Sequence, residues 1–156
     1  MTRLVLPRIA RLLRRVLLPL PLVFALLPAP GVAQVTGDSA ALYLAFGEKD
    51  GIAALMDDFV NRLRVDPRIG HFFKNTQPAN LKEQLTNQLC LVSGGPCKYQ
   101  GDSMKASHAD LQIRSADFNA LVEVLQQSMD ARGIAFTAQN RMLALLAPMH
   151  RDIIAR

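Results

Sequence analysis

The residue with the most specific chemistry is a histidine in an irregular part of the chain. His108 lies between Gly94 and Ser115, in a stretch that joins two clearly periodic segments and has no sustained apolar stripe of its own. A connection of this length in a small helical domain is usually functional or disordered. Neutral imidazole is the commonest metal ligand among side chains. We therefore take His108 as a candidate metal ligand, although spacing alone favours a structural histidine held by hydrogen bonds.

The only two cysteines of the chain lie in the same region. Cys90 and Cys97 are seven residues apart, on either side of Gly94-Gly95-Pro96. This spacing differs from that of a Cys-x-x-Cys redox pair, and no further cysteine could complete a zinc site. In an oxidising compartment the two could form a disulfide. A disulfide and a pair of buried or partly buried free thiols both remain open.

Four longer segments with helical periodicity must position these residues. Each has apolar residues at intervals of three and four, and no segment alternates strongly enough for a strand. Asp66-Pro67 should end the first segment, Pro78 should begin the second, Ser115 should cap the third, and Thr137 should open the fourth. Pro148 should kink the last helix near its end. We therefore predict an all-α domain in which one antiparallel pair of helices packs across another.

A short helical turn is also expected inside the irregular stretch. Met104, His108 and Leu111 follow the spacing i, i+4, i+7, which places them on one face of a helix. Such a turn would direct His108 inward beside apolar neighbours. The space left by the missing long helix must be filled by side chains or by a ligand.

The first 33 residues have the layout of an export signal. Five arginines precede an apolar run over residues 16–27 that two prolines interrupt, and small residues close the segment at Ala33. The run is short for a transmembrane helix. We expect a secretory signal peptide over residues 1–33, a mature domain over residues 34–156, and a periplasmic or extracellular location. An uncleaved N-terminal anchor is the alternative.

Removal of this leader changes the charge of the protein. The whole chain has 18 lysines and arginines against 13 aspartates and glutamates, and the leader holds five of the arginines and no acidic residue. The mature domain would therefore have 13 residues of each sign. A nucleic-acid-binding protein needs a basic face that survives processing. We expect no nucleic-acid partner and no membrane span in the mature chain.

Several short motifs, taken together, resemble the group 1 truncated haemoglobins over about residues 40 to 154. Single glycine pairs are weak evidence, whereas seven elements in the right order and spacing are strong. They are Gly94-Gly95-Pro96, Tyr99-x-Gly101, Met104-Lys105-x-x-His108, Phe59 with Phe72-Phe73, Leu42-Tyr43 with Gly47, Gly51-Ile52, and Asp66-Pro67-Arg68-Ile69.

The resemblance implies a two-over-two helical sandwich that encloses haem b. His108 would be the proximal iron ligand, and Phe73 would pack on the porphyrin. Lys105, and less clearly Lys82, could pair with the haem propionates or remain solvated. The expected haem-contacting residues are His108, Phe73, Phe59, Leu81, Leu85, Met104, Lys105, Tyr99 and Leu111.

The distal side departs from the family pattern. Many members have a tyrosine after the phenylalanine of the first long helix, where this chain has Val60, and the positions that often carry glutamine hold Leu81 and Leu85. The resemblance therefore implies a mainly apolar distal pocket with fast release of O₂ and little change in CO binding. Gln84 and Gln88 are nearby on the same helix and either could turn inward. His71 is a further conceivable donor, although a surface position is expected for it.

These expectations favour a haem protein that senses, carries or buffers a diatomic gas, O₂, CO or NO, at a five-coordinate iron. The alternative is a haem enzyme, a nitric oxide dioxygenase or a peroxidase-like protein, which would need a partner reductase. A haem-free helical adaptor is the third possibility.

Overall fold

The computed structural model describes residues 35–154, with their side chains from residue 40 onward. The expected leader over residues 1–33 lies outside this part. Helices account for most of the described chain, and no strand occurs between residues 35 and 154. In chain order the elements are α1 (Val35–Ala45), α2 (Glu48–Val65), the 3₁₀ turn η1 (Gly70–Phe73), α3 (Pro78–Val92), α4 (Met104–His108), α5 (Ser115–Ala131), α6 (Phe136–Leu146), the 3₁₀ turn η2 (Ala147–Met149) and α7 (His150–Ile153).

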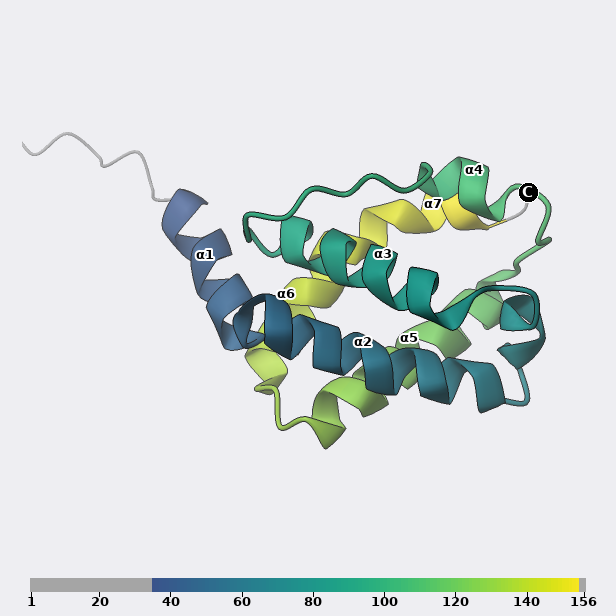
Figure 1. Cartoon of the computed structure of the whole chain (residues 1–156), viewed down its shortest axis with the longest axis horizontal. Helices are drawn as coiled ribbons and strands as arrows, with labels where there is room; N and C mark the ends of the chain where they lie inside the picture. The colour runs from purple at the N-terminus through teal and green to yellow at the C-terminus, as the bar shows by residue number, and fades with distance from the viewer. Residues whose placement is uncertain (1–34, 155–156) are drawn as a thin grey trace, which may run out of the picture. The chain divides into compact units, whose positions relative to one another are not determined.

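The four long helices form two layers, as the periodicity predicted. Helices α2 and α3 pack side by side in one layer, and α5 and α6 cross behind them (Figure 1). Helix α1 packs on α2 and α6, and the short α4 lies against α7 at one edge. The long connection between α3 and α5 runs along this edge and carries α4 (Figure 1).

Helix α2 supplies much of the hydrophobic core. Its apolar residues recur at helical spacing, so one face of the helix turns inward while charged residues cover the other. Asp66 leaves the helical conformation in front of Pro67, and this ends the helix where the sequence predicted. The side chains of α2 that are buried are Ile52, Leu55, Met56, Phe59, Val60 and Leu63.

The helix ends differ from the predictions in three places. Ser115 is the first residue of α5 and does not cap it; the carboxylate of Asp117 accepts from the backbone N–H of Arg114 at 2.9 Å instead. Helix α6 begins at Phe136, one residue before Thr137. Pro148 does more than kink the last helix, because α6 ends at Leu146 and a 3₁₀ turn separates it from α7. Helix α1 had no counterpart among the predicted helices.

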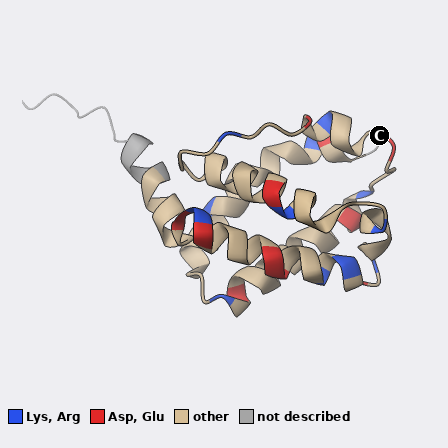
Figure 2. Ribbon diagram, viewed as in Figure 1, with Lys and Arg blue, Asp and Glu red and all other residues tan. Residues whose placement is uncertain are grey.

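Charged residues of both signs are interspersed on the ribbon in the view of Figure 2. Within residues 35–154, every helix is too short or too polar to cross a lipid bilayer.

Candidate functional site

One face of α3 turns toward α4 and η2. Leu81, Gln84, Leu85 and Gln88 follow the spacing i, i+3, i+4, i+7, so they share this face. Gln88 is 8% exposed, and its Nε2 lies 3.4 Å from Sδ of Met104 in α4 and 3.5 Å from Sδ of Met149 in η2. These contacts fix the direction in which the whole face of α3 points.

His108 is the last residue of α4 and is half-buried. Its Nδ1 lies 2.7 Å from the backbone carbonyl oxygen of Met104 and 3.0 Å from the hydroxyl of Ser107. A carbonyl oxygen can only accept, so Nδ1 carries the ring proton and donates it. The other nitrogen, Nε2, therefore keeps its lone pair available for a metal.

The short α4 owes its start to its own sequence. Ser103 adopts an extended conformation before the helix, and its hydroxyl accepts from the backbone N–H of Ala106 at 3.2 Å. This N-cap satisfies one of the free donors of the first turn. Because His108 is four residues after Met104, one turn of helix suffices to bring its ring onto the Met104 carbonyl.

The end of α3 is cross-linked to the segment that leads to α4. A disulfide joins Cys90, fully buried in the last turn of α3, to Cys97 in the irregular segment that follows. Of the two possibilities left open by the sequence, the structure therefore contains the disulfide. Gly94 has φ of +88°, a conformation that favours glycine at a helix end, and the N–H of Gly95 bonds the carbonyl of Cys90 at 2.8 Å.

An open pocket of about 760 Å³ lies between the segment that precedes α3 and the segment that follows α4. Its walls include Phe72 of η1 and Leu111, which is 37% exposed. Leu111 lies beyond the end of α4, because the helix stops at His108, three residues before the end of the turn that the spacing of Met104, His108 and Leu111 suggested.

Apolar side chains dominate the interior near this face. Val60 is fully buried on α2, and Phe59 belongs to the hydrophobic core at 3% exposed. Phe73 and Leu85 are half-buried and pack against the same core, and Leu81 is half-buried on α3. Phe59, Phe73 and Leu85 thus contribute to one hydrophobic cluster.

Three polar side chains were candidates for the distal side. The structure places Gln84 and Gln88 on the inner face of α3 and His71 on the surface. Gln84 has a buried Oε1 atom with no hydrogen-bond partner, and Gln88 is engaged by the two methionine sulfurs. His71 is exposed, and its ring lies 4.0 Å from that of Phe72. It occupies the surface position that the sequence predicted.

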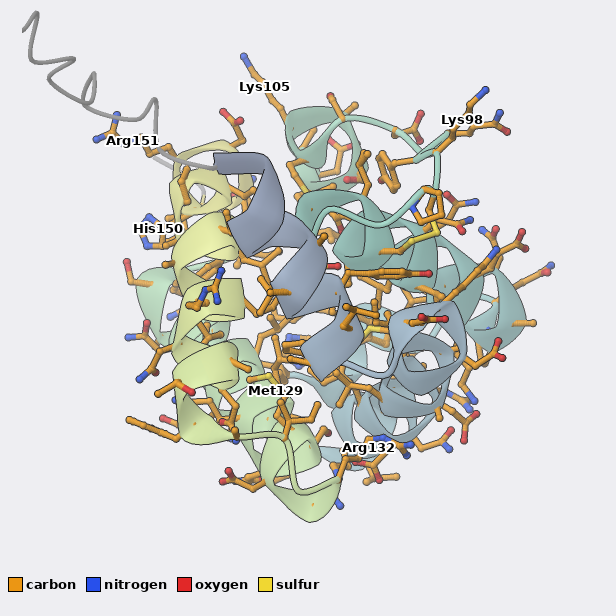
Figure 3. The ribbon with its side chains drawn as sticks, turned by 90° about the vertical axis from the view of Figure 1, so that its left-hand side faces the viewer. Lys98, Lys105, Met129, Arg132, His150 and Arg151 are labelled. Carbon is orange, nitrogen blue, oxygen red and sulfur yellow. A yellow bond between two sulfur atoms is a disulfide. The ribbon has the colours of Figure 1, made fainter. Side chains whose placement is uncertain are left out.

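Lys105 is exposed to solvent, whereas Lys82 and Tyr99 are hydrogen-bonded to other residues. Lys105 is exposed, and Figure 3 shows its side chain extending away from the bundle. Lys82 donates to Asp57 on α2 at 2.5 Å and to Asn61 at 3.2 Å, so a propionate would have to replace these partners. Tyr99 donates to the carbonyl of Asp102 at 2.8 Å, and burial raises the pKa of its hydroxyl.

The residues present fit a haem group. The Nδ1 of His108 is bonded to a carbonyl, which leaves Nε2 available, and the inner face of α3 is half apolar and carries a buried carboxamide oxygen without a donor. An unsatisfied buried polar atom usually marks a missing water, ion or ligand. Haem iron needs one such imidazole and an apolar pocket on its other side. His108 would hold the iron, with α3 facing the ligand side.

Two features of the site were missed by the sequence analysis. The acceptor for the histidine Nδ1–H is a backbone carbonyl, although the i, i+4 spacing of Met104 and His108 could have indicated it. The contact of Met149 with Gln88 joins residues 61 positions apart in the chain, so no local pattern could have signalled it.

Comparisons with known proteins agree with this geometry. The family model for bacterial-like globins matches residues 41–155. A group 1 truncated haemoglobin of Tetrahymena pyriformis is 25% identical over 115 residues, which cover 74% of this chain and 95% of that protein.

Solved structures agree as well. The crystal structure of truncated haemoglobin from Tetrahymena pyriformis in its Fe(III) form aligns with a TM-score of 0.71 at 25% identity, covering 74% of this chain and 98% of that one. The 2/2 haemoglobin of Synechococcus sp. PCC 7002, solved in the cyanomet state with covalently attached haem, aligns with a TM-score of 0.69 at 22% identity over the same shares. These likenesses confirm the expected all-α, two-over-two fold and the resemblance to group 1 truncated haemoglobins.

Proposed function

Because this chain belongs to the bacterial-like globin family, we propose that it is a haem b protein that reversibly binds a diatomic gas. The observation that carries the proposal is the orientation of His108. Its Nδ1–H is bonded to the Met104 carbonyl, so its Nε2 is free to bind the iron from the proximal side. Haem supplies an open sixth coordination position for O₂, CO or NO when one imidazole holds the iron.

The protein's own part in this function is to hold, orient and dry the group. The hydrogen bond from His108 to a carbonyl fixes the ring plane and raises the basicity of the ligating nitrogen. Val60, Leu81 and Leu85 present only carbon atoms, and this apolar wall excludes water from the ligand side. We propose that Phe73, Phe59 and Leu111 also contact the haem, because His108 would hold the iron and α3 would face the ligand side.

The enzymatic alternative has less support in the geometry. A peroxidase-like reaction uses an acid–base group on the ligand side to assist O–O cleavage. His71 is exposed, and its ring makes a tilted contact with that of Phe72, with the ring centroids 4.0 Å apart. Gas binding therefore fits the described residues better than acid–base chemistry, and a reductase partner is left to experiment.

Titration of the reduced, haem-loaded protein with gases tests this function. We expect stoichiometric CO binding, and O₂ binding that is reversed by removing O₂ without oxidation of most of the iron. Bound O₂ should leave fast, because the apolar residues at positions 60, 81 and 85 provide no donor to it. A ferrous form that binds neither CO nor O₂ would refute the proposal.

We also propose that the protein works outside the cytoplasm. The support is the Cys90–Cys97 disulfide, since structural disulfides persist mainly in oxidising compartments. The layout of residues 1–33 points the same way. N-terminal sequencing of the protein from expressing cells should give a start at Gln34, and a start at Met1 would contradict cleavage.

A further inference from the structure

The buried carboxamide of Gln88 has a role that the proposed function leaves open. We propose that Gln88 is a positioning residue for His108, and that it acts from α3 through the side chain of Met104. This inference rests on the proposed function, since it concerns the orientation of the proximal imidazole. It assigns a proximal role to a residue that sequence alone places on the ligand side.

The hydrogen-bond chemistry of Gln88 matches its surroundings. A carboxamide NH₂ group has two donors, and a thioether sulfur is a weak acceptor. The Gln88 Nε2 meets two such acceptors, Met104 Sδ at 3.4 Å and Met149 Sδ at 3.5 Å. At 8% exposed, the amide has almost no access to water that could replace them. One side chain thus joins α3, α4 and η2.

Helix α4 needs such an anchor because little else holds it. It has only five residues, and none of them is buried. Its main packing partner is α7, a helix of four residues. The irregular segment that leads into α4 is fixed to α3 by the disulfide, but Cys97 is seven residues before Met104. The Gln88 amide is a contact between α3 and α4 that acts on the helix itself.

The contact reaches His108 through a single residue. Gln88 holds the side chain of Met104, and the backbone carbonyl of the same Met104 accepts from His108 Nδ1 at 2.7 Å. Freedom of Met104 would therefore loosen the bond that sets the ring plane and the basicity of Nε2. A weaker bond at Nδ1 makes imidazole a weaker iron ligand. The hydrogen bonds of Gln88 go to the two methionine sulfurs and not to the His108 ring, so its effect on the ring passes through Met104.

A double-mutant cycle with Gln88→Leu and Met104→Leu tests the inference. Both substitutions keep the volume and leave the Met104 carbonyl in place, and Leu at position 88 creates no buried unsatisfied donor. The first readout is the iron–histidine stretching frequency of the ferrous protein. The second is hydrogen exchange of the α4 amides in the haem-free protein. An exposed glutamine on α5 supplies the matched control, Gln127→Leu.

We expect each single variant to lower the iron–histidine frequency and to speed α4 exchange by roughly threefold, the lower range for one hydrogen bond. The double variant should show no larger effect than either single one, because both remove the same contact. Gln127→Leu should match the wild type.

Unchanged frequency and exchange in Gln88→Leu, or additive effects in the double variant, would overturn the inference while haem binding stands. Failure of the wild type to bind haem would instead overturn the proposed function.

Discussion

The Nδ1 atom of His108 lies 2.7 Å from the backbone carbonyl oxygen of Met104, one helical turn earlier in α4. Because the acceptor belongs to the backbone, it is present whatever side chain occupies position 104. The bond fixes both the tautomer and the plane of the ring, and it turns Nε2 into the available ligand atom. The five residues of α4 thus contain a ligand together with the group that orients it.

A donor added to the ligand side should slow the release of O₂. Leu85→Gln introduces a carboxamide at nearly constant volume on the face of α3 that turns toward α4 and η2. A neutral hydrogen bond contributes about 0.5–1.5 kcal/mol, so we expect O₂ dissociation to slow by roughly threefold to tenfold. CO dissociation should change little, because bound CO is less polarised. Stopped-flow measurement on the wild type, Leu85→Gln and Leu85→Met distinguishes the donor from the change of shape.

Much of the fold could be predicted from the sequence, because helical periodicity is a local signal. Pro67 and Pro78 set the end of α2 and the start of α3 through backbone restrictions that need no tertiary information. The start of α5 was assigned to the wrong cap, since Ser115 and Asp117 both offer a capping oxygen and only the folded chain shows which one bonds. Pro148 had a larger effect than a kink because a 3₁₀ turn forms around it.

The disulfide should stabilise the folded protein by fixing the segment after α3 to the last turn of that helix. Cys97→Ala leaves Cys90 buried as a thiol and removes only the cross-link. Loop-entropy arguments give a loss of about 2–3 kcal/mol in the free energy of unfolding. Urea unfolding with and without a dithiol reductant measures it. Reduction should lower the stability of the wild type to that of Cys97→Ala and should leave the variant unchanged; a wild type insensitive to full reduction would contradict this.

Gly95 should tolerate no side chain, because the disulfide and a tyrosine occupy the space. A Cβ atom there would lie 2.5 Å from Cε2 of Tyr43 and 2.6 Å from Sγ of Cys90. We expect Gly95→Ala to cost about 1–3 kcal/mol, as overpacked cores do. Gly133→Ala is the matched comparison, since its Cβ would meet nothing within 4 Å and its φ of +67° makes backbone strain the cause of any loss. Haem should dissociate faster from Gly95→Ala than from the wild type, because Gly95 lies in the segment that leads to α4. Gly133→Ala should lose haem at the wild-type rate.

An ion-pair network beside η1 should make the stability depend on pH. The guanidinium of Arg68 bonds Asp66 at 2.9 Å and Glu123 of α5 at 2.5 Å, and the bond from Arg68 holds the pKa of the Asp66 carboxyl below its usual value of 3.8. A lowered pKa stabilises the folded state above pH 3.8 and stops doing so as the pH falls through the lowered value.

Asp66→Asn should therefore lower the melting temperature of the haem-free protein at neutral pH, and the difference from the wild type should shrink in acid. In an Arg68→Ala background, Asp66→Asn should lower the melting temperature at neutral pH by a much smaller amount. If the difference in melting temperature between the wild type and Asp66→Asn grew as the pH fell, the lowered pKa of Asp66 would be contradicted.

The site could be predicted less completely than the fold. The sequence singled out His108 through its place in an irregular stretch, and the apolar wall through Leu81 and Leu85 on one helical face. It could not show that Gln88 engages Met104 and Met149, because that contact depends on how α3, α4 and η2 meet. Likewise, the bonds of Lys82 to Asp57 and Asn61 depend on the packing of α3 against α2, which no local pattern in the sequence indicates.

The most direct test is the absorption spectrum of the purified protein after addition of haemin, compared between the wild type and His108→Ala. The wild type should bind haemin one to one and give a Soret band that shifts on reduction and again with CO. His108→Ala should lose the spectrum of an imidazole-bound iron, and added imidazole should restore it. A colourless wild type, or a His108→Ala spectrum identical to that of the wild type, would contradict the account.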